Sequence, residues 1–216
     1  MENMSEPQDA AGTEREGPPW ENPSAGDFFQ RLWQTVVQGV SSPSELFANM
    51  RTTGGLISPL VFYVLIIGAG AIVSTALEMP FGLLGGSGGA DAILGFFLVL
   101  ILLPVLLPIG LFVSSGITHL ALMVFGGANK PYEATFRVNA YAYGSVGWVW
   151  AIPFCGSLVG GIWGIVLEII GVARVHEVST GKAAAAVLVP LAIIAMFGAC
   201  VALIFGLAVF GMADHS

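Results

Sequence analysis

Apolar residues are gathered into five long stretches, with short polar segments between them. A helix needs about 20 residues to cross a hydrocarbon core of ~30 Å. The first, second and fifth stretches reach this length, and the third and fourth are shorter. The pattern predicts an all-α integral membrane bundle of five transmembrane helices, with spans at about 57–79, 92–125, 138–153, 157–172 and 184–211.

The second stretch is longer than one bilayer crossing requires. As a straight helix it would extend ~50 Å, and Pro104 and Pro108 interrupt its hydrogen-bonding pattern near the middle. We expect one kinked or broken span. A broken helix would release backbone carbonyls that can line a cavity, whereas a kink would be purely structural.

Two further segments precede the first span. Residues 1–26 are acidic and rich in Glu, Pro, Gly and Ser, which predicts a disordered cytosolic tail, with a short docking peptide as the alternative. Residues 27–52 predict amphipathic interfacial helices. Asp27 is placed to cap the first of them, and Ser42 begins a capping box for the second. The first helix could equally pack against the cytosolic ends of the spans.

All basic residues lie on one side of the five stretches. Basic residues are retained in the cytosol during insertion, so the charges predict a cytosolic N-terminus and an external C-terminus. Because the segments that contain basic residues alternate with segments that contain none, the charges also favour counting both short stretches as spans. The N-terminal region lacks the pattern of a cleavable signal peptide. The basic residues are Arg15, Arg31, Arg51, Lys130, Arg137, Arg174 and Lys182.

Composition excludes several classes of protein. Hydrophobic residues make up 56% of the chain and charged residues 10%, against about 25% charged residues in soluble domains. The formal net charge is −7 and there is no basic patch, which argues against a nucleic-acid partner. Cys155 and Cys200 fall at different predicted depths, so we expect no disulfide.

Small residues recur every four positions in three of the spans. This spacing predicts close helix packing, either within the chain or against a second copy. The stripes are Gly110–Ser114–Thr118, Gly156–Gly160–Gly164 and Gly198–Ala202–Gly206.

Two ionisable residues lie within the predicted spans at similar depth, and such residues are candidates for function. His119 and Glu168 could form an intramembrane polar pair. One interpretation is a proton-linked or polar-substrate site. The other is a hydrogen bond that locks two helices together, which we favour.

The sequence predicts no catalytic, metal-binding or cofactor-binding residues. Ser115 and His119 lack a third orienting group. His176 and Glu177 do not continue into a metalloprotease motif, and the segment ending at Lys182 lacks the first glycine of a phosphate-binding loop. We therefore expect a protein that is not an enzyme and has no cofactor.

The segment from Gly126 to Pro190 resembles the Yip family of Ypt-interacting-protein type, and the resemblance extends over about residues 41–210. It rests on the order of several short motifs. These are Gly126–Gly127, Tyr132–Val138 followed by Tyr141, Leu167–Gly171, His176, Lys182–Ala183 and Leu188–Pro190, with Pro43–Phe47 and Gly54–Gly55 before the first span.

The resemblance implies five membrane spans with a cytosolic N-terminus. Eukaryotic members are associated with Rab-type GTPases, but the short loops here look bacterial, so no GTPase partner is carried over. The family supplies no catalytic residue to transfer. Its recurrent positions and the two basic turns instead indicate a cytosolic face that contacts lipid headgroups or protein, or that only anchors topology. The candidate residues of this face are Tyr132, Arg137, Tyr141, Arg174, His176 and Lys182.

These observations favour a non-enzymatic membrane-organising or adaptor protein in the cytoplasmic (inner) membrane of a bacterium. Its expected partners are the lipid bilayer and either a membrane protein or a second copy of the chain. The alternative is a small transporter or channel that uses the broken second span with His119 and Glu168. An intramembrane enzyme is a weaker third possibility.

Overall fold

The structure is a computed structural model that describes residues 15–84 and 89–213. Within these ranges the chain forms helices and no β-strand, as the sequence predicted. The elements are η1 (Pro19–Glu21), η2 (Pro23–Ala25), α1 (Phe28–Ser41), α2 (Pro43–Ala48), α3 (Ile57–Leu84), α4 (Gly89–Val124), α5 (Tyr132–Val146), η3 (Gly147–Ala151), α6 (Gly156–Val175) and α7 (Thr180–Ala213).

Four of the described helices are long and apolar enough to cross a membrane. They are α3, α4, α6 and α7. Many of their large apolar side chains are exposed, including Ile101, Phe197 and Leu203. Exposed apolar surface on this scale requires lipid as its solvent. The chain is therefore a multi-pass membrane protein.

The predicted third span has a different position in the fold. Residues 138–153 form the second part of α5, then η3 and the turn before α6. α5 begins earlier, at Tyr132, and packs against α1, α3, α4 and α6. Its polar residues, including Thr135 and Arg137, are buried among these neighbours. With 15 residues, or ~22 Å, α5 is too short to cross a bilayer alone, and its crossing together with η3 stays a prediction.

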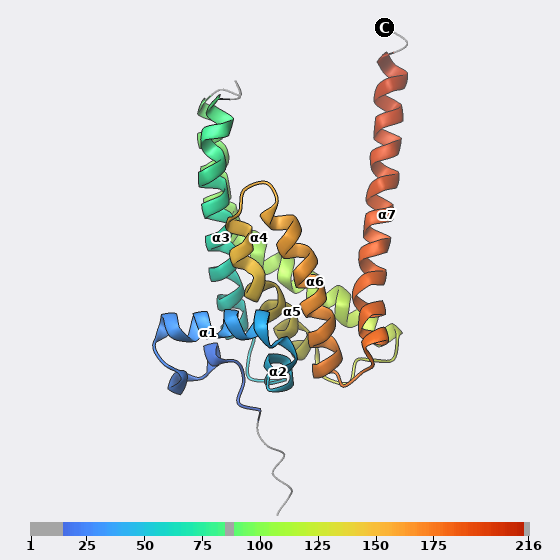
Figure 1. Ribbon diagram of the computed structural model, residues 1–216. Helices are drawn as coiled ribbons and strands as arrows, with labels where there is room; N and C mark the ends of the chain where they lie inside the picture. The colour runs from blue at the N-terminus through green and yellow to red at the C-terminus, as the bar shows by residue number, and fades with distance from the viewer. Residues whose placement is uncertain (1–14, 85–88, 214–216) are drawn as a thin grey trace, which may run out of the picture.

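α4 is one uninterrupted helix of 36 residues that continues through Pro104 and Pro108. It passes behind the α5–α6 pair, from α3 to the base of α7 (Figure 1). Proline removes one backbone hydrogen bond but need not end a membrane helix. The continuous helix favours the kinked alternative over the broken one.

One end of the bundle carries the basic residues. α1 and α2 lie at this end, whereas α3 and α7 rise to the opposite end (Figure 1). Segments 125–131 and 176–179 connect helices at the same end as α1. We call this region the basic end, because all seven Lys and Arg residues lie at or near it.

α1 has three faces. Thr35, Val36 and Gly39 are buried against the bundle, while the polar side is exposed at Gln30 and Gln34. Between these two faces runs an exposed apolar stripe that consists of Phe29, Trp33 and Val37. Phe29 is 76% exposed and Trp33 62% exposed. α1 therefore packs on the bundle, which is one of the two alternatives considered from the sequence, and its position in the membrane interface stays a prediction.

The prediction of a disordered tail does not hold for residues 15–26. This segment forms η1 and η2 and docks at the basic end, where Trp20 is buried. The backbone N–H of Trp20 donates to Thr35 Oγ1 (2.8 Å), and its indole N–H donates to the carbonyl of Ser58 (2.8 Å). An aromatic anchor with a satisfied polar tip offsets the low apolar content of the segment. The rest of the predicted tail, residues 1–14, lies outside the described residues.

The small-residue stripe of α6 packs within the chain. A Cβ atom built at Gly164 would lie 2.4 Å from the ring of Tyr143, and one at Gly160 would lie 2.8 Å from Trp150. In contrast, a Cβ atom at Gly110 or Gly198 would meet nothing within 4 Å. Close packing is thus confirmed for α6 and its neighbour is intramolecular. For Gly206 the structure describes the backbone alone.

Candidate functional site

A chain of hydrogen bonds joins three segments at the basic end. His119 Nδ1 on α4 lies 2.8 Å from Thr135 Oγ1 on α5, and the same oxygen lies 2.9 Å from Nε2 of His176, which follows α6. The loop before α5 is attached to the same residue. Asn129 Nδ2 donates to the His176 carbonyl (2.8 Å), and the Lys130 N–H donates to His176 Nδ1 (3.3 Å).

These hydrogen bonds indicate which ring nitrogens of His176 and His119 donate and which accept. His176 Nδ1 accepts from Lys130, so in the neutral ring Nε2 carries the proton and donates to Thr135. The Thr135 hydroxyl is then left to donate to His119 Nδ1. Burial lowers the pKa of His176 to about 4, and the nearby His119 and Lys130 act in the same direction. The ring of His176 is therefore neutral at pH 7.

Exposed ion pairs connect the two turns of the basic end to each other and to Arg15 of the N-terminal segment. The carboxylate of Glu177 lies 3.1 Å from both Lys130 Nζ and Arg15 Nη2. Lys130, with a smaller effect of Arg15, lowers the pKa of Glu177. Because Glu177 is exposed, these pairs contribute little stability. Lys182 Nζ also donates to the carbonyl of Gly126 (3.1 Å).

Arg137 is the largest fully buried side chain in the described part of the protein. Its Nε donates to the carbonyl of Arg51 (2.8 Å) and its Nη1 to that of Gly55 (2.9 Å). Its Nη2 forms an ion pair with Glu21, and the other carboxylate oxygen of Glu21 accepts from the Tyr141 hydroxyl. Every nitrogen of the guanidinium group is thus bound, so Arg137 fixes the N-terminal segment to α5.

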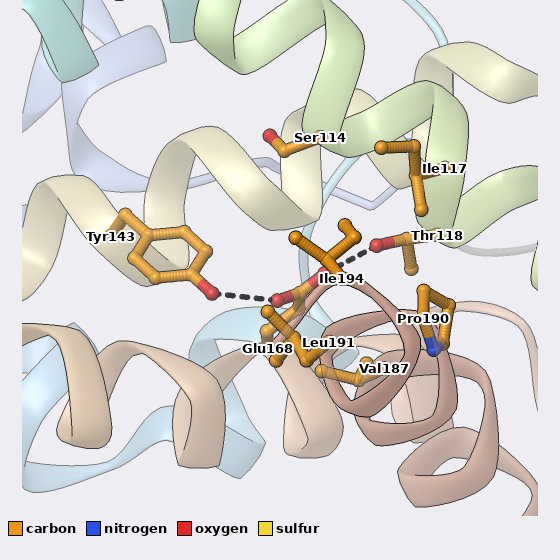
Figure 2. Close-up of a pocket in the computed structure, with 9 residues that line it drawn as sticks. All are labelled: Ser114, Ile117, Thr118, Tyr143, Glu168, Val187, Pro190, Leu191 and Ile194. Atoms are coloured by element: carbon orange, nitrogen blue, oxygen red, sulfur yellow. Dashed lines mark hydrogen bonds between the residues drawn. The ribbon is translucent and has the colours of Figure 1, made fainter. Parts of the chain in front are cut away.

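Glu168 occupies a pocket between α4, α5, α6 and α7. Thr118 Oγ1 donates to one of its carboxylate oxygens (2.8 Å) and the Tyr143 hydroxyl to the other (2.9 Å). Figure 2 shows these two donors approaching Glu168 from opposite sides. The pocket has a volume of about 80 Å³, and its lining is completed by Ser114, Ile117, Val187, Pro190, Leu191 and Ile194.

The structure places His119 and Glu168 in separate hydrogen-bonded groups. His119 contacts Thr135, whereas Glu168 contacts Thr118, the residue that precedes His119. Consecutive helical residues point about 100° apart, so one turn of α4 serves both groups.

The remaining candidates of the cytosolic face are divided between the interior and the surface. Arg137, Tyr141 and His176 are buried, and Tyr132 donates through its hydroxyl to the Phe112 carbonyl (3.0 Å). Arg174 is exposed in the last turn of α6.

Sequence reasoning missed several residues of these groups. Glu21, Thr118, Thr135 and Tyr143 each bind an ionisable residue that the sequence did single out. Thr118 could have been found from its place in the Gly110–Ser114–Thr118 stripe. Glu21 carries no local signal, because its partner lies 116 positions away.

Within residues 15–84 and 89–213 there is no group of three His, Cys, Asp or Glu side chains that could hold a metal ion. Cys155 and Cys200 are both free and exposed.

Comparison with known proteins gives one family. The Yip1 domain matches residues 39–210, which is most of the chain. No curated protein and no solved structure matches this chain. The match covers all four candidate membrane helices and the histidine and arginine groups described above, apart from the N-terminal segment that carries Glu21. The chain therefore belongs to the Yip1 domain family of multi-pass membrane proteins.

Proposed function

We propose that this protein is a non-enzymatic membrane-organising or adaptor protein that acts through its basic end. The observation that carries the proposal is the construction of that end. Its two turns are joined through His176, and α1 is packed beside them with an apolar stripe left exposed. A single rigid surface can therefore contact lipid and a protein partner at the same time.

The exposed stripe on α1 suits the interface of a bilayer. Amphipathic helices lie there with aromatic and aliphatic side chains in the acyl boundary. α1 runs across the direction of the long helices at the basic end (Figure 1). With Phe29 and Trp33 in lipid, Gln30 and Gln34 would remain in water.

The proposed location is the cytoplasmic membrane of a bacterium, with the basic end in the cytosol. The positive-inside rule supports this orientation. Cys155 precedes α6, at the end of that helix remote from the basic end, and is exposed. A membrane-impermeant maleimide should therefore label Cys155 in intact cells whose outer membrane has been permeabilised. If Cys155 is labelled only after lysis of the inner membrane, the protein has the opposite orientation and the proposed one is wrong.

The adaptor role is tested by chemical crosslinking in the native host, followed by purification of the tagged protein. The wild type should recover a reproducible set of membrane or cytosolic proteins. The variant Arg174→Gln, which changes an exposed charge in the last turn of α6, should recover less of that set at equal abundance. Recovery of no partner by the wild type would contradict the proposal.

A second candidate function, a small transporter or channel, is favoured by the pocket that contains Glu168. A transport path would have to connect this pocket to water. In a background with Cys155→Ser and Cys200→Ala, the variant Ser114→Cys tests this connection, because Ser114 lines the pocket. Modification by a water-soluble thiol reagent would support transport, and complete protection would count against it.

A further inference from the structure

Glu168 is a buried acid without a basic partner. It is 3% exposed, and within residues 15–84 and 89–213 no Lys, Arg or His side chain forms an ion pair with it. An unpaired charge within a membrane helix is costly, and such residues usually face a cavity or a ligand path. Glu168 follows this rule, because its carboxylate lines the pocket.

The pocket presents oxygen atoms whose protons are already used. The hydroxyls of Thr118 and Tyr143 donate to Glu168, and that of Ser114 donates to the carbonyl of Leu111 (3.1 Å). A hydroxyl that has donated its proton retains lone pairs that can accept or coordinate. The polar atoms of the pocket are therefore suited to a positively charged group.

Asn139 lies beside Glu168 but outside the lining of the pocket. It is fully buried on α5 and interacts with Glu168. Neither its amide nitrogen nor its amide oxygen has a hydrogen-bond partner with acceptable geometry among the described residues. Asn139 does not line the pocket, so it can affect the site only through its interaction with the Glu168 carboxylate.

The size of the pocket limits the ligand. A volume of about 80 Å³ is enough for several waters, because about 10–15 Å³ of such volume holds one. It is well below the ~300 Å³ at which pockets for drug-sized ligands begin. One carboxylate balances one positive charge.

We propose that this pocket is a binding site for a small monovalent cation, either an alkali-metal ion or an ammonium group. The carboxylate of Glu168 supplies the charge, and the hydroxyl oxygens of Thr118 and Tyr143, which donate to it, supply neutral ligands. A bound cation would be the counter-charge that the protein itself does not provide. This inference goes beyond the proposed function and does not depend on a partner at the basic end.

The test uses the full chain in lipid nanodiscs, with thermal unfolding followed by tryptophan fluorescence. Parallel samples contain sodium, potassium, ammonium or choline chloride at the same ionic strength and pH. A ligand that binds only the folded state raises the Tm in a concentration-dependent manner. At least one small cation should raise the Tm above that in choline, whose methyl groups keep its charged nitrogen away from oxygen ligands, and the effect should saturate.

The pattern among the salts identifies the ligand. Stabilisation by sodium or potassium would indicate an alkali-metal ion, and stabilisation by ammonium alone would indicate an amine. An identical Tm in all four salts would overturn the proposal, because the pocket would then hold water beside a protonated acid.

Two variants locate the effect. Glu168→Gln keeps the shape of the side chain and removes its charge, so the difference between the salts should disappear. Glu45→Gln removes an exposed acid on α2 and should leave the difference intact. Loss of the difference in both variants, or in neither, would contradict a site at Glu168. If Glu168→Gln does not fold, the titration of the wild type still decides between binding and no binding.

Discussion

Arg137 and Glu21 form a buried ion pair that ties the N-terminal segment to the central helix α5, across 116 positions of sequence. The side chain of Arg137 is fully buried and that of Glu21 is 6% exposed. Two backbone carbonyls and the Tyr141 hydroxyl complete the group. An ion pair with this many hydrogen bonds can compensate for much of the cost of removing its charges from water.

Replacement of Glu21 should destabilise the fold strongly. Glu21→Ala leaves the guanidinium group of Arg137 buried without a counter-charge, and breaking such pairs costs about 3–5 kcal/mol. Chemical denaturation in detergent micelles measures the change. Glu16→Ala removes a nearby exposed acid and should be close to neutral. Equal effects of the two variants would show that Glu21 is not buried against Arg137.

The hydroxyl of Thr135 should contribute to stability through the two histidines it joins. Thr135→Val keeps the shape of the side chain but leaves His119 Nδ1 and His176 Nε2 without this partner. An unsatisfied buried group costs about 1–3 kcal/mol, and this cost applies to His176, which is buried, more than to the partly buried His119. Thr75→Val is the matched control, because Thr75 donates only to a carbonyl of its own helix. Unfolding curves of the two variants that coincide would argue against the bridge.

His176 should make stability depend on pH. Its pKa is about 4 in the folded protein and about 6.5 in an unfolded chain. The contribution of the neutral ring to the free energy of unfolding is therefore fully present above pH 6.5. It is lost as the pH falls towards 4, because the unfolded state takes up the proton first.

The variant His176→Asn isolates this contribution from those of the other titratable groups. The difference in unfolding free energy between wild type and variant should shrink between pH 6.5 and 4. A difference that stays constant over this interval would contradict a neutral, buried His176.

The stripe on α1 should lie in lipid. Spin labels at Trp33→Cys and Gln34→Cys, in the background without native cysteines, occupy neighbouring positions on different faces of the helix. In nanodiscs, oxygen should relax the label at position 33 more strongly, and a water-soluble nickel complex should relax the one at position 34. Equal accessibility of the two labels to oxygen and to the nickel complex would contradict a position of the stripe in lipid.

Much of the fold could be predicted because lipid imposes a simple rule on sequence. α3, α4, α6 and α7 meet lipid along their length, so their apolar runs are visible without knowledge of their neighbours. α5 does not follow this rule, because it is surrounded by protein and its polar residues are buried there. Its start at Tyr132 could not be read from hydropathy.

The candidate sites were predictable only in part. His119 and Glu168 were identified as costly residues within spans, but their partners depend on the rotation of each helix. Thr118 and His119 are adjacent in sequence and belong to different groups for this reason. The docking of Glu21 depends on a long-range contact that composition does not encode.

The central claim, that the basic end contacts a partner, is tested most directly by photo-crosslinking in the native host. A benzophenone amino acid replaces Gly181 in the first turn of α7 or Gly198 further along the same helix. Neither position has a neighbour within 4 Å of an added Cβ atom, so the probe should not disturb the fold at either one. We predict discrete protein adducts from position 181, and lipid adducts or none from position 198. The absence of protein adducts at position 181, with normal abundance and membrane insertion, would contradict the account.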